Sequence, residues 1–237
     1  IIPAGFIPNL LRRFLSSFLV DASMPFERKS AILEEAFAPH LRTLAAMTRS
    51  AKDWVQDNMI NPAYFGVCLS IPTVLKNMGE GFEAINTCPS FAEDWRWFKS
   101  LVGESRRMNE HFLGEYWRKL HNFFDCRLSP VGGDSANNQK LEELGYAILS
   151  EVAKHESLRF SGNRDSAESD VKLNDMVKQL CGLLTGDSLA AKREFAGIFS
   201  KLPNITASDV AGMNAFGALF GRETVYLSLL KSAFSRQ

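Results

Sequence analysis

The sequence predicts a mostly α-helical protein, a helical bundle-like fold with at most a short two-stranded β element and two packed helical parts. Apolar residues recur at helical spacing over most of the 237 residues. Strand-like patterns are confined to two short stretches, 65–69 and 82–86. The composition, 46% hydrophobic and 23% charged, is that of an ordinary globular chain, which at this length buries a core without disulfides or metal.

Charge, hydropathy and cysteine usage exclude several classes of protein. Lys+Arg 27 balance Asp+Glu 27, so the chain lacks the long-range field on which nucleic-acid and anionic-membrane binders rely. The apolar stretch at 10–20 is too short to span a bilayer and is not followed by a signal-peptide cleavage pattern. Four cysteines without a C-x-x-C pair argue against a zinc ribbon or a disulfide framework. We therefore expect a cytoplasmic protein with reduced thiols, and neither nucleic acid nor a membrane as a partner.

The first part, residues 1–130, begins with three predicted helices. An apolar stripe runs along residues 10–20. The second helix covers 25–39, with a proline in its first turn and another that closes it. The third covers 50–61 and starts at the capping residue Ser50. The expected inner face of the second helix consists of Phe26, Ile32, Leu33 and Phe37.

A helix that leads into a strand follows. Ser70 begins this helix, Pro72 lies in its first turn and Gly79 ends it. Residues 82–86 then form a strand, which we expect to pair with the apolar run 65–69.

Two aromatic helices complete the first part. The stretch 90–93 has the S-x-x-E pattern of a capping box, which predicts that a helix begins at Ser90. Residues 108–124 have the most regular amphipathic spacing in the chain.

Turn-forming and polar residues mark two boundaries. The first lies at 130–135, and the second is the polar run 156–169, which we expect to form a loop that divides the two packed parts near Ser161. These two boundaries divide the chain into three parts: the helical region 1–130, a helix and polar linker at 131–165, and a C-terminal helical subdomain at 166–237. Helices are predicted at 137–154, 171–184, 188–202 and 206–234, the last one broken at Gly221.

The densest candidate site is an aromatic and basic cluster between residues 94 and 125. Indole and guanidinium groups side by side can line a pocket for a flat or anionic ligand. Aromatic residues at helical spacing more often belong to the core, and both interpretations remain open at this point. The candidate substrate-contact residues are Trp95, Arg96, Trp97 and His111.

The sequence predicts no metal or cofactor site in this chain and identifies no catalytic residue. His111 and His121 are ten residues apart on one predicted helix, roughly 15 Å, so they cannot share a metal. Either histidine could transfer protons, or it could have a purely structural role. The phosphate-binding, dinucleotide-binding and hydrolase glycine motifs do not occur.

A resemblance to one enzyme family comes from residues 70–89, which read SIPTVLKNMGEGFEAINTCP. This segment resembles the late helix-then-strand unit of class I S-adenosylmethionine-dependent methyltransferases, and DWRWFKSL after it is similar to a helical extension of some related proteins. The resemblance implies a chain that follows a missing cofactor-binding half, with Ile1-Ile2-Pro3 as the end of an upstream strand. It implies S-adenosylmethionine as the cofactor of that half, and no binding of it by this chain alone.

Two functional hypotheses follow. The first is a substrate-recognition or cap region of a small-molecule group-transfer enzyme, such as a methyltransferase. The second is a non-catalytic interaction or dimerisation module whose apolar C-terminal helices bind a partner helix or a second copy of the chain, although burial in its own core is the more common explanation for such residues. The residues concerned are Phe195, Ile198, Phe199, Phe216, Leu219, Phe220, Leu229 and Phe234.

Overall fold

The mostly α-helical class is confirmed. A computed structural model describes residues 6–21, 23–44, 47–60, 70–88, 90–93, 108–120, 132–161, 166–219 and 226–231. Within these ranges the chain forms ten α-helices and a single two-stranded sheet.

The chain begins with three helices, as predicted. They are α1 (Phe6–Leu19), α2 (Phe26–Leu41) and α3 (Ala51–Val55), and the π-helix η1 (Gln56–Ile60) continues α3. The hydroxyl of Ser50 caps α3 by accepting a 3.0 Å hydrogen bond from a backbone N–H in its first turn.

Both ends of α2 differ from the prediction. The helix continues beyond Pro39 to Leu41, because a proline in the last turn removes a single backbone hydrogen bond. Phe26 was expected on the inner face, yet its side chain is 49% exposed. The first turn of α2 projects past the core, since burial starts at Ser30.

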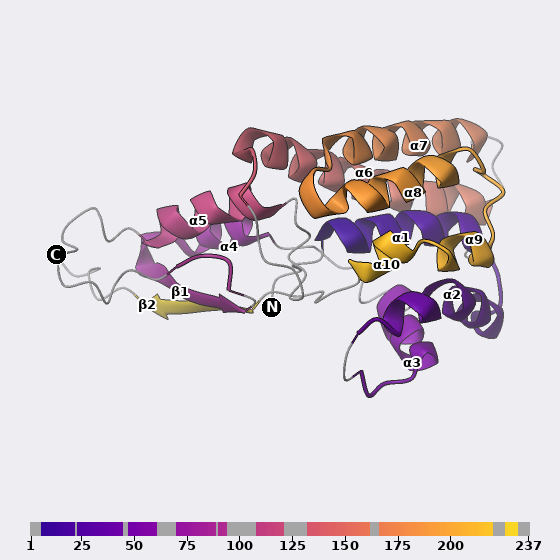
Figure 1. Cartoon of the computed structure of the whole chain (residues 1–237), viewed down its shortest axis with the longest axis horizontal. Coiled ribbons are helices and arrows are strands. Elements are labelled where there is room, and N and C mark those ends of the chain that lie inside the picture. The colour runs from indigo at the N-terminus through magenta and orange to yellow at the C-terminus, as the bar shows by residue number, and fades with distance from the viewer. Residues whose placement is uncertain are drawn as a thin grey trace.

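Two long helices lie side by side in the bundle, namely α6 (Ser135–Ser161) and α7 (Ser166–Leu183) (Figure 1). Residues 156–161 and 166–169 are helical, so the prediction of a loop is wrong for these parts of the polar run, and residues 162–165 at its centre lie outside the described residues. Glu156 gains a partner on α1 through a 3.0 Å ion pair with Arg13, which favours continuation of the helix. Buried residues on both sides of residues 162–165 contribute to one core.

Within its described residues, the C-terminal region contains a 3₁₀ turn, three helices and a strand. They are η6 (Gly186–Ser188), α8 (Leu189–Phe199), α9 (Ala207–Ala211), α10 (Asn214–Ala218) and β2 (Tyr226–Lys231).

The prediction of helix at 206–234, broken at Gly221, is therefore wrong for residues 226–231, which form a strand, and the part before the break forms two short helices. A tertiary contact fixes the start of α10: the carboxylate of Glu194 on α8 accepts hydrogen bonds from the backbone N–H groups of Ala215 and Phe216, both 2.8 Å. These N–H groups belong to the first turn, where a helix has no internal acceptors for them.

A small lobe is formed by α4 (Ile71–Met78), the 3₁₀ turn η3 (Gly79–Gly81), β1 (Phe82–Cys88), α5 (Met108–Lys119) and β2. β1 pairs antiparallel with β2, and a bulge lies between residues 84 and 86. The predicted pairing partner at 65–69 lies outside the described residues, and β2 is a partner that the sequence analysis did not foresee.

The helix predicted to begin at Ser90 does not begin there, because residues 90–93 are not helical. The Ser90 hydroxyl donates to the backbone oxygen of Ala92 instead of capping a first turn. Phe91 is buried against Phe112 and Tyr116, so tertiary packing outweighs the local capping signal.

The buried residues form two separate clusters. The larger core lies in the helical bundle and includes four of the predicted interface residues, Phe195, Ile198, Phe216 and Leu219. The smaller core lies in the small lobe, where Leu227 and Leu229 of β2 pack against it. Figure 1 shows these two lobes at opposite ends of an elongated molecule, and α6, which contacts both α5 and α1, reaches from one to the other.

Candidate functional site

The structure places one of the four predicted contact residues. Trp95, Arg96 and Trp97 lie outside the described residues. His111 lies on α5, half-buried, with its imidazole edge-on to the ring of Phe112 and 6.1 Å between ring centroids. The convergence of these four side chains therefore remains a prediction.

The described half of the aromatic cluster supplies the small core. Phe112 and Tyr116 are buried, one helical turn apart on α5. Phe91 meets their rings edge-on, with centroid distances of 6.2 and 6.4 Å. Trp117 is half-buried, with its ring 5.0 Å from that of Tyr116. For this helix face, core packing explains the aromatic spacing.

Three polar side chains from three helices converge between the two cores, and we call Ser70, Tyr116 and Glu142 the junction cluster. The Tyr116 hydroxyl donates a hydrogen bond to Glu142 Oε2, and the Ser70 hydroxyl lies near enough to both groups to oppose the rise of their pKa values. All three are buried, with exposures of 5%, 5% and 6%. Because α6 belongs to the bundle, this cluster joins the small lobe to it.

Local sequence explains how each member reaches the junction. Ser70 precedes α4, and its hydroxyl accepts a hydrogen bond from the backbone N–H of Thr73, which fixes it as the N-cap. Tyr116 lies on the buried stripe of α5. Glu142 is one residue after the buried Leu141 of α6.

Sequence reasoning missed Glu142, although a signal was present. Asn138, Glu142 and Tyr146 recur every four residues, so they form a row along one side of α6 next to its apolar stripe. Asn138 and Glu142 are buried and Tyr146 packs partly against the larger core. A polar row beside an apolar one predicts that a second element covers the helix there.

The electrostatics of the junction cluster favour its uncharged forms. Burial raises the pKa of Glu142, and the charge of Glu143 adds to this effect, while hydrogen bonds from Tyr116 and Ser70 oppose it. Burial and the nearby carboxylate of Glu142 raise the pKa of Tyr116 well above its ordinary value. The site can therefore hold a proton that an exposed carboxyl would release.

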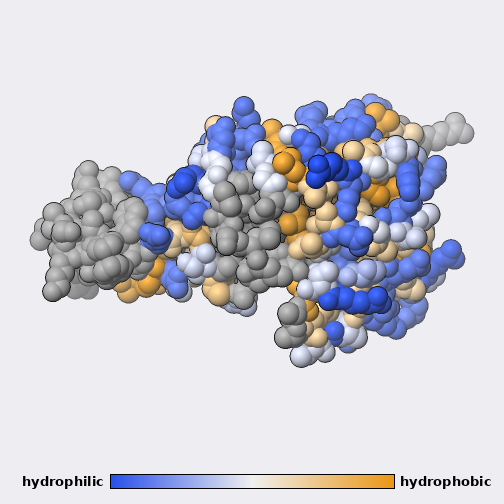
Figure 2. All heavy atoms as spheres, in the orientation of Figure 1, coloured by the Kyte–Doolittle hydropathy of each residue, from blue (hydrophilic) through white to orange (hydrophobic). Residues whose placement is uncertain are grey.

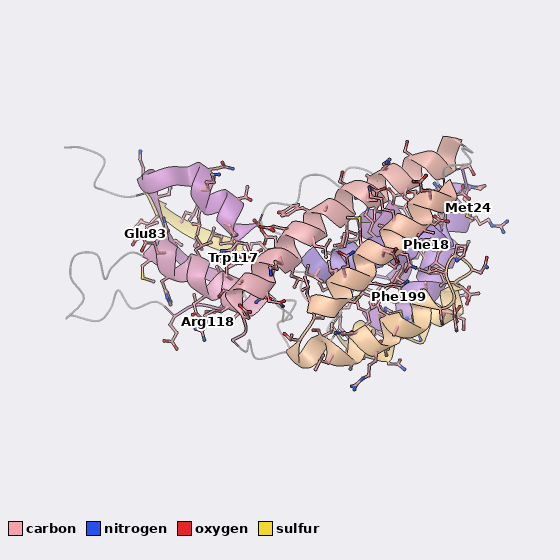
Figure 3. All side chains as sticks on the ribbon, turned by 90° about the horizontal axis from the view of Figure 1, so that it is seen from above. Phe18, Met24, Glu83, Trp117, Arg118 and Phe199 are labelled. Carbon is pink, nitrogen blue, oxygen red and sulfur yellow. The ribbon has the colours of Figure 1, made fainter. Side chains whose placement is uncertain are left out.

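Backbone contacts hold α5 and α6 together beside the cluster. Asn138 Nδ2 donates a hydrogen bond to the backbone oxygen of Trp117 at 2.6 Å. The backbone N–H of Gly133 donates a hydrogen bond to the backbone oxygen of Arg118 at 2.8 Å. Figure 3 shows Trp117 and Arg118 where α5 approaches the start of α6. The end of α5 is thereby fixed to the first turns of α6.

Basic side chains of α5 are engaged in an ion-pair group. Arg118 and Lys119 both contact Glu115, at 2.6 and 2.7 Å. Burial alone would raise the pKa of Glu115, but the hydrogen bonds from Lys119 and Arg118 outweigh it and lower the pKa. The Lys119 ammonium also donates to the backbone oxygen of Phe91.

The bundle contains a second polar pair, of which one member is buried. His155 Nε2 donates to Asp170 Oδ1 and links α6 to α7, and the imidazole lies 5.1 Å from the ring of Phe18. Figure 3 places Phe18 within the bundle, away from Trp117. Because His155 is fully buried, we assign the pair to packing. Among the described residues no group of three or more acidic, histidine or cysteine side chains could hold a metal ion.

The described helices include none that is both long and apolar enough to cross a membrane.

Comparison with known proteins identifies no relative: no family model, no curated protein and no solved structure matches this chain. The resemblance to methyltransferases therefore stays a prediction.

Proposed function

We propose that this chain is a substrate-recognition or cap region of a small-molecule group-transfer enzyme, and that its ligand binds beside the junction cluster. One observation carries the proposal: the buried Glu142 carboxyl, hydrogen-bonded to Tyr116, lies between two separate cores. Ligand sites occur preferentially between structural units, and acids that retain protons cluster at functional sites.

The chemistry of the cluster favours an uncharged ligand. Burial favours the protonated form of the Glu142 carboxyl, and a carboxyl and two hydroxyl groups exchange hydrogen bonds with hydroxyl or amide groups. The half-buried indole of Trp117, next to Tyr116, offers a surface for a ring. Methyl transfer is the reaction that we infer from the sequence resemblance, with S-adenosylmethionine held by residues outside this chain.

Three ring compounds test this proposal: phenol, benzamide and the cationic benzamidine. We expect phenol and benzamide at millimolar concentration to shift the indole N–H signal of Trp117 in NMR spectra, and benzamidine to act more weakly. Tyr116→Phe should weaken the response severalfold, whereas the exposed Tyr226→Phe should leave it unchanged. The proposal would be contradicted if none of the three compounds shifted the Trp117 signal. It would also be contradicted if Tyr116→Phe and Tyr226→Phe weakened the shift equally.

A second candidate function, self-association, is favoured by the outer face of the two-stranded sheet. Tyr226 and Leu230 of β2 are 52% and 53% exposed on the face opposite Leu227 and Leu229. Figure 2 shows hydrophobic atoms at this edge of the small lobe. Six residues extend about 20 Å, so the face is far smaller than the ~800 Å² per partner of a stable interface. Association through it would be weak.

Light scattering at up to about 1 mM protein tests self-association. The double variant Tyr226→Ser and Leu230→Ser should remain monomeric where the wild type begins to associate. Val171→Ser is the matched control, because Val171 is 62% exposed on α7, away from the sheet. A monomeric wild type over the whole range would exclude this function.

A further inference from the structure

We propose that the junction cluster is a protonation-sensitive latch, which holds the small lobe against the bundle while the Glu142 carboxyl is neutral and loosens when this carboxyl loses its proton. The inference concerns the chain without a ligand and does not depend on the proposed function.

The first support is geometric. The two cores share no buried residue, and the hydrogen bond from Tyr116 to Glu142 runs between them. The buried Ser70, which is the N-cap of α4, lies beside these two residues. Opening the lobes would break this hydrogen bond and leave buried polar groups to be solvated anew, so the latch resists separation while the bond is intact.

The second support is the cost of a charge at this place. Glu142 is 6% exposed, and a buried carboxylate is expensive unless a cation compensates it. The groups that influence its titration are Tyr116 of α5, Ser70 of α4 and Glu143 of α6, and Tyr146 of α6 acts on Tyr116. None of these is a cation, and within the described ranges no ion pair includes Glu142.

The direction of the pH effect follows from the raised pKa of Glu142. A carboxyl that holds its proton more firmly in the closed form than in the open one contributes stability to the closed form at low pH. This contribution is complete below the ordinary carboxyl pKa of 4.5 and is lost as the pH rises through the raised value. The small lobe should therefore open more readily as the pH increases.

Amide hydrogen exchange, corrected for the intrinsic pH dependence of exchange, measures the latch. In the wild-type chain we expect the protection of β1 and α4 to fall as the pH rises from 4.5 to 8, by at most about tenfold per pH unit because one proton is involved. Glu142→Gln, which keeps the acceptor oxygen and cannot ionise, should remove this dependence. Glu143→Gln on the same helix is the control and should retain it.

A second variant keeps the test decisive if Glu142→Gln does not fold. Tyr116→Phe removes a hydrogen bond that stabilises the Glu142 carboxylate, so the carboxyl should titrate at a higher pH, measured from its ¹³C NMR signal. An unchanged titration midpoint in Tyr116→Phe would overturn the proposal. The proposal would also be overturned if amide protection in Glu142→Gln still fell with rising pH as it does in the wild type.

Discussion

At the scale of single residues, the contact between Gly217 and His40 leaves no room for another atom. A Cβ atom at Gly217 would lie 2.6 Å from His40 Cδ2. The imidazole cannot move away easily, because the rings of Phe37 and Phe216 meet it edge-on at 5.8 and 6.0 Å. Glycine is required here because α10 packs directly on the end of α2.

This contact predicts opposite effects for two glycine substitutions. Gly217→Ala should lower the free energy of unfolding by about 1–3 kcal/mol through overpacking. Gly197→Ala should raise it by about 0.5–1 kcal/mol, because Gly197 is inside α8 and a Cβ there meets no atom within 4 Å. Urea denaturation of both variants measures the difference, and effects of the same sign would contradict the packing.

His40 also makes stability depend on pH. Burial lowers the pKa of its imidazole from 6.5 to about 4, the positive charge of Arg12 acts in the same direction, and a backbone hydrogen bond at Val210 opposes them. The folded state thus favours the neutral ring. The contribution of His40 to the free energy of unfolding is complete above pH 6.5 and is lost as the pH falls toward 4.

This loss of unfolding free energy is about 3 kcal/mol, because each unit by which the pKa is lowered corresponds to ~1.4 kcal/mol. In His40→Gln the corresponding slope should disappear. Urea denaturation of both proteins between pH 7 and 4 gives the difference in unfolding free energy, and a constant difference would show that His40 does not titrate in this range.

At the scale of elements, α6 organises its neighbours through its first turn. Asn138 binds the end of α5, and its neighbour Asn137 donates to the backbone oxygen of Leu183 at the end of α7, at 2.9 Å. Two adjacent side chains thus hold the C-terminal ends of two helices, where backbone oxygens have no partner within their own helix.

The strand β2 predicts unequal roles for two neighbouring leucines. Leu229 points toward the small core and Leu230 is 53% exposed, as the alternation of a strand requires. Leu229→Ala should lower the free energy of unfolding by about 1–2 kcal/mol and Leu230→Ala by less than about 0.5 kcal/mol. Equal losses in urea denaturation would contradict the strand and favour the helix that the sequence predicts here.

At the scale of the whole molecule, two cores imply two units of local stability. Phe112 is fully buried in the small core and Phe195 in the larger one. Phe112→Ala should accelerate amide exchange in α4 and β1 at least tenfold while α7 stays protected, and Phe195→Ala should expose α7 and α8. Equal acceleration of both lobes in either variant would show a single cooperative unit.

Periodicity identified the parts of the fold that local patterns control. The helices α1, α3, α4 and α5 appear where apolar spacing and capping residues predict them, and Gly79, with a φ of +61°, ends α4 as expected. The candidate site was less predictable. His111 lies on the expected helix. Glu142 was missed because a single acidic residue in a helix carries no sign of its burial, and the only signal was the row that it forms with Asn138 and Tyr146.

The sequence by itself determined the helical class, most helix positions and the balanced charge, because these depend on composition and on contacts a few residues apart. The tertiary structure decided that residues 226–231 form a strand beside β1, that Ser90 does not start a helix, and that Ser70, Tyr116 and Glu142 meet. Each of these depends on groups far apart in the chain, whose contacts outweigh local preferences of about 1 kcal/mol or less.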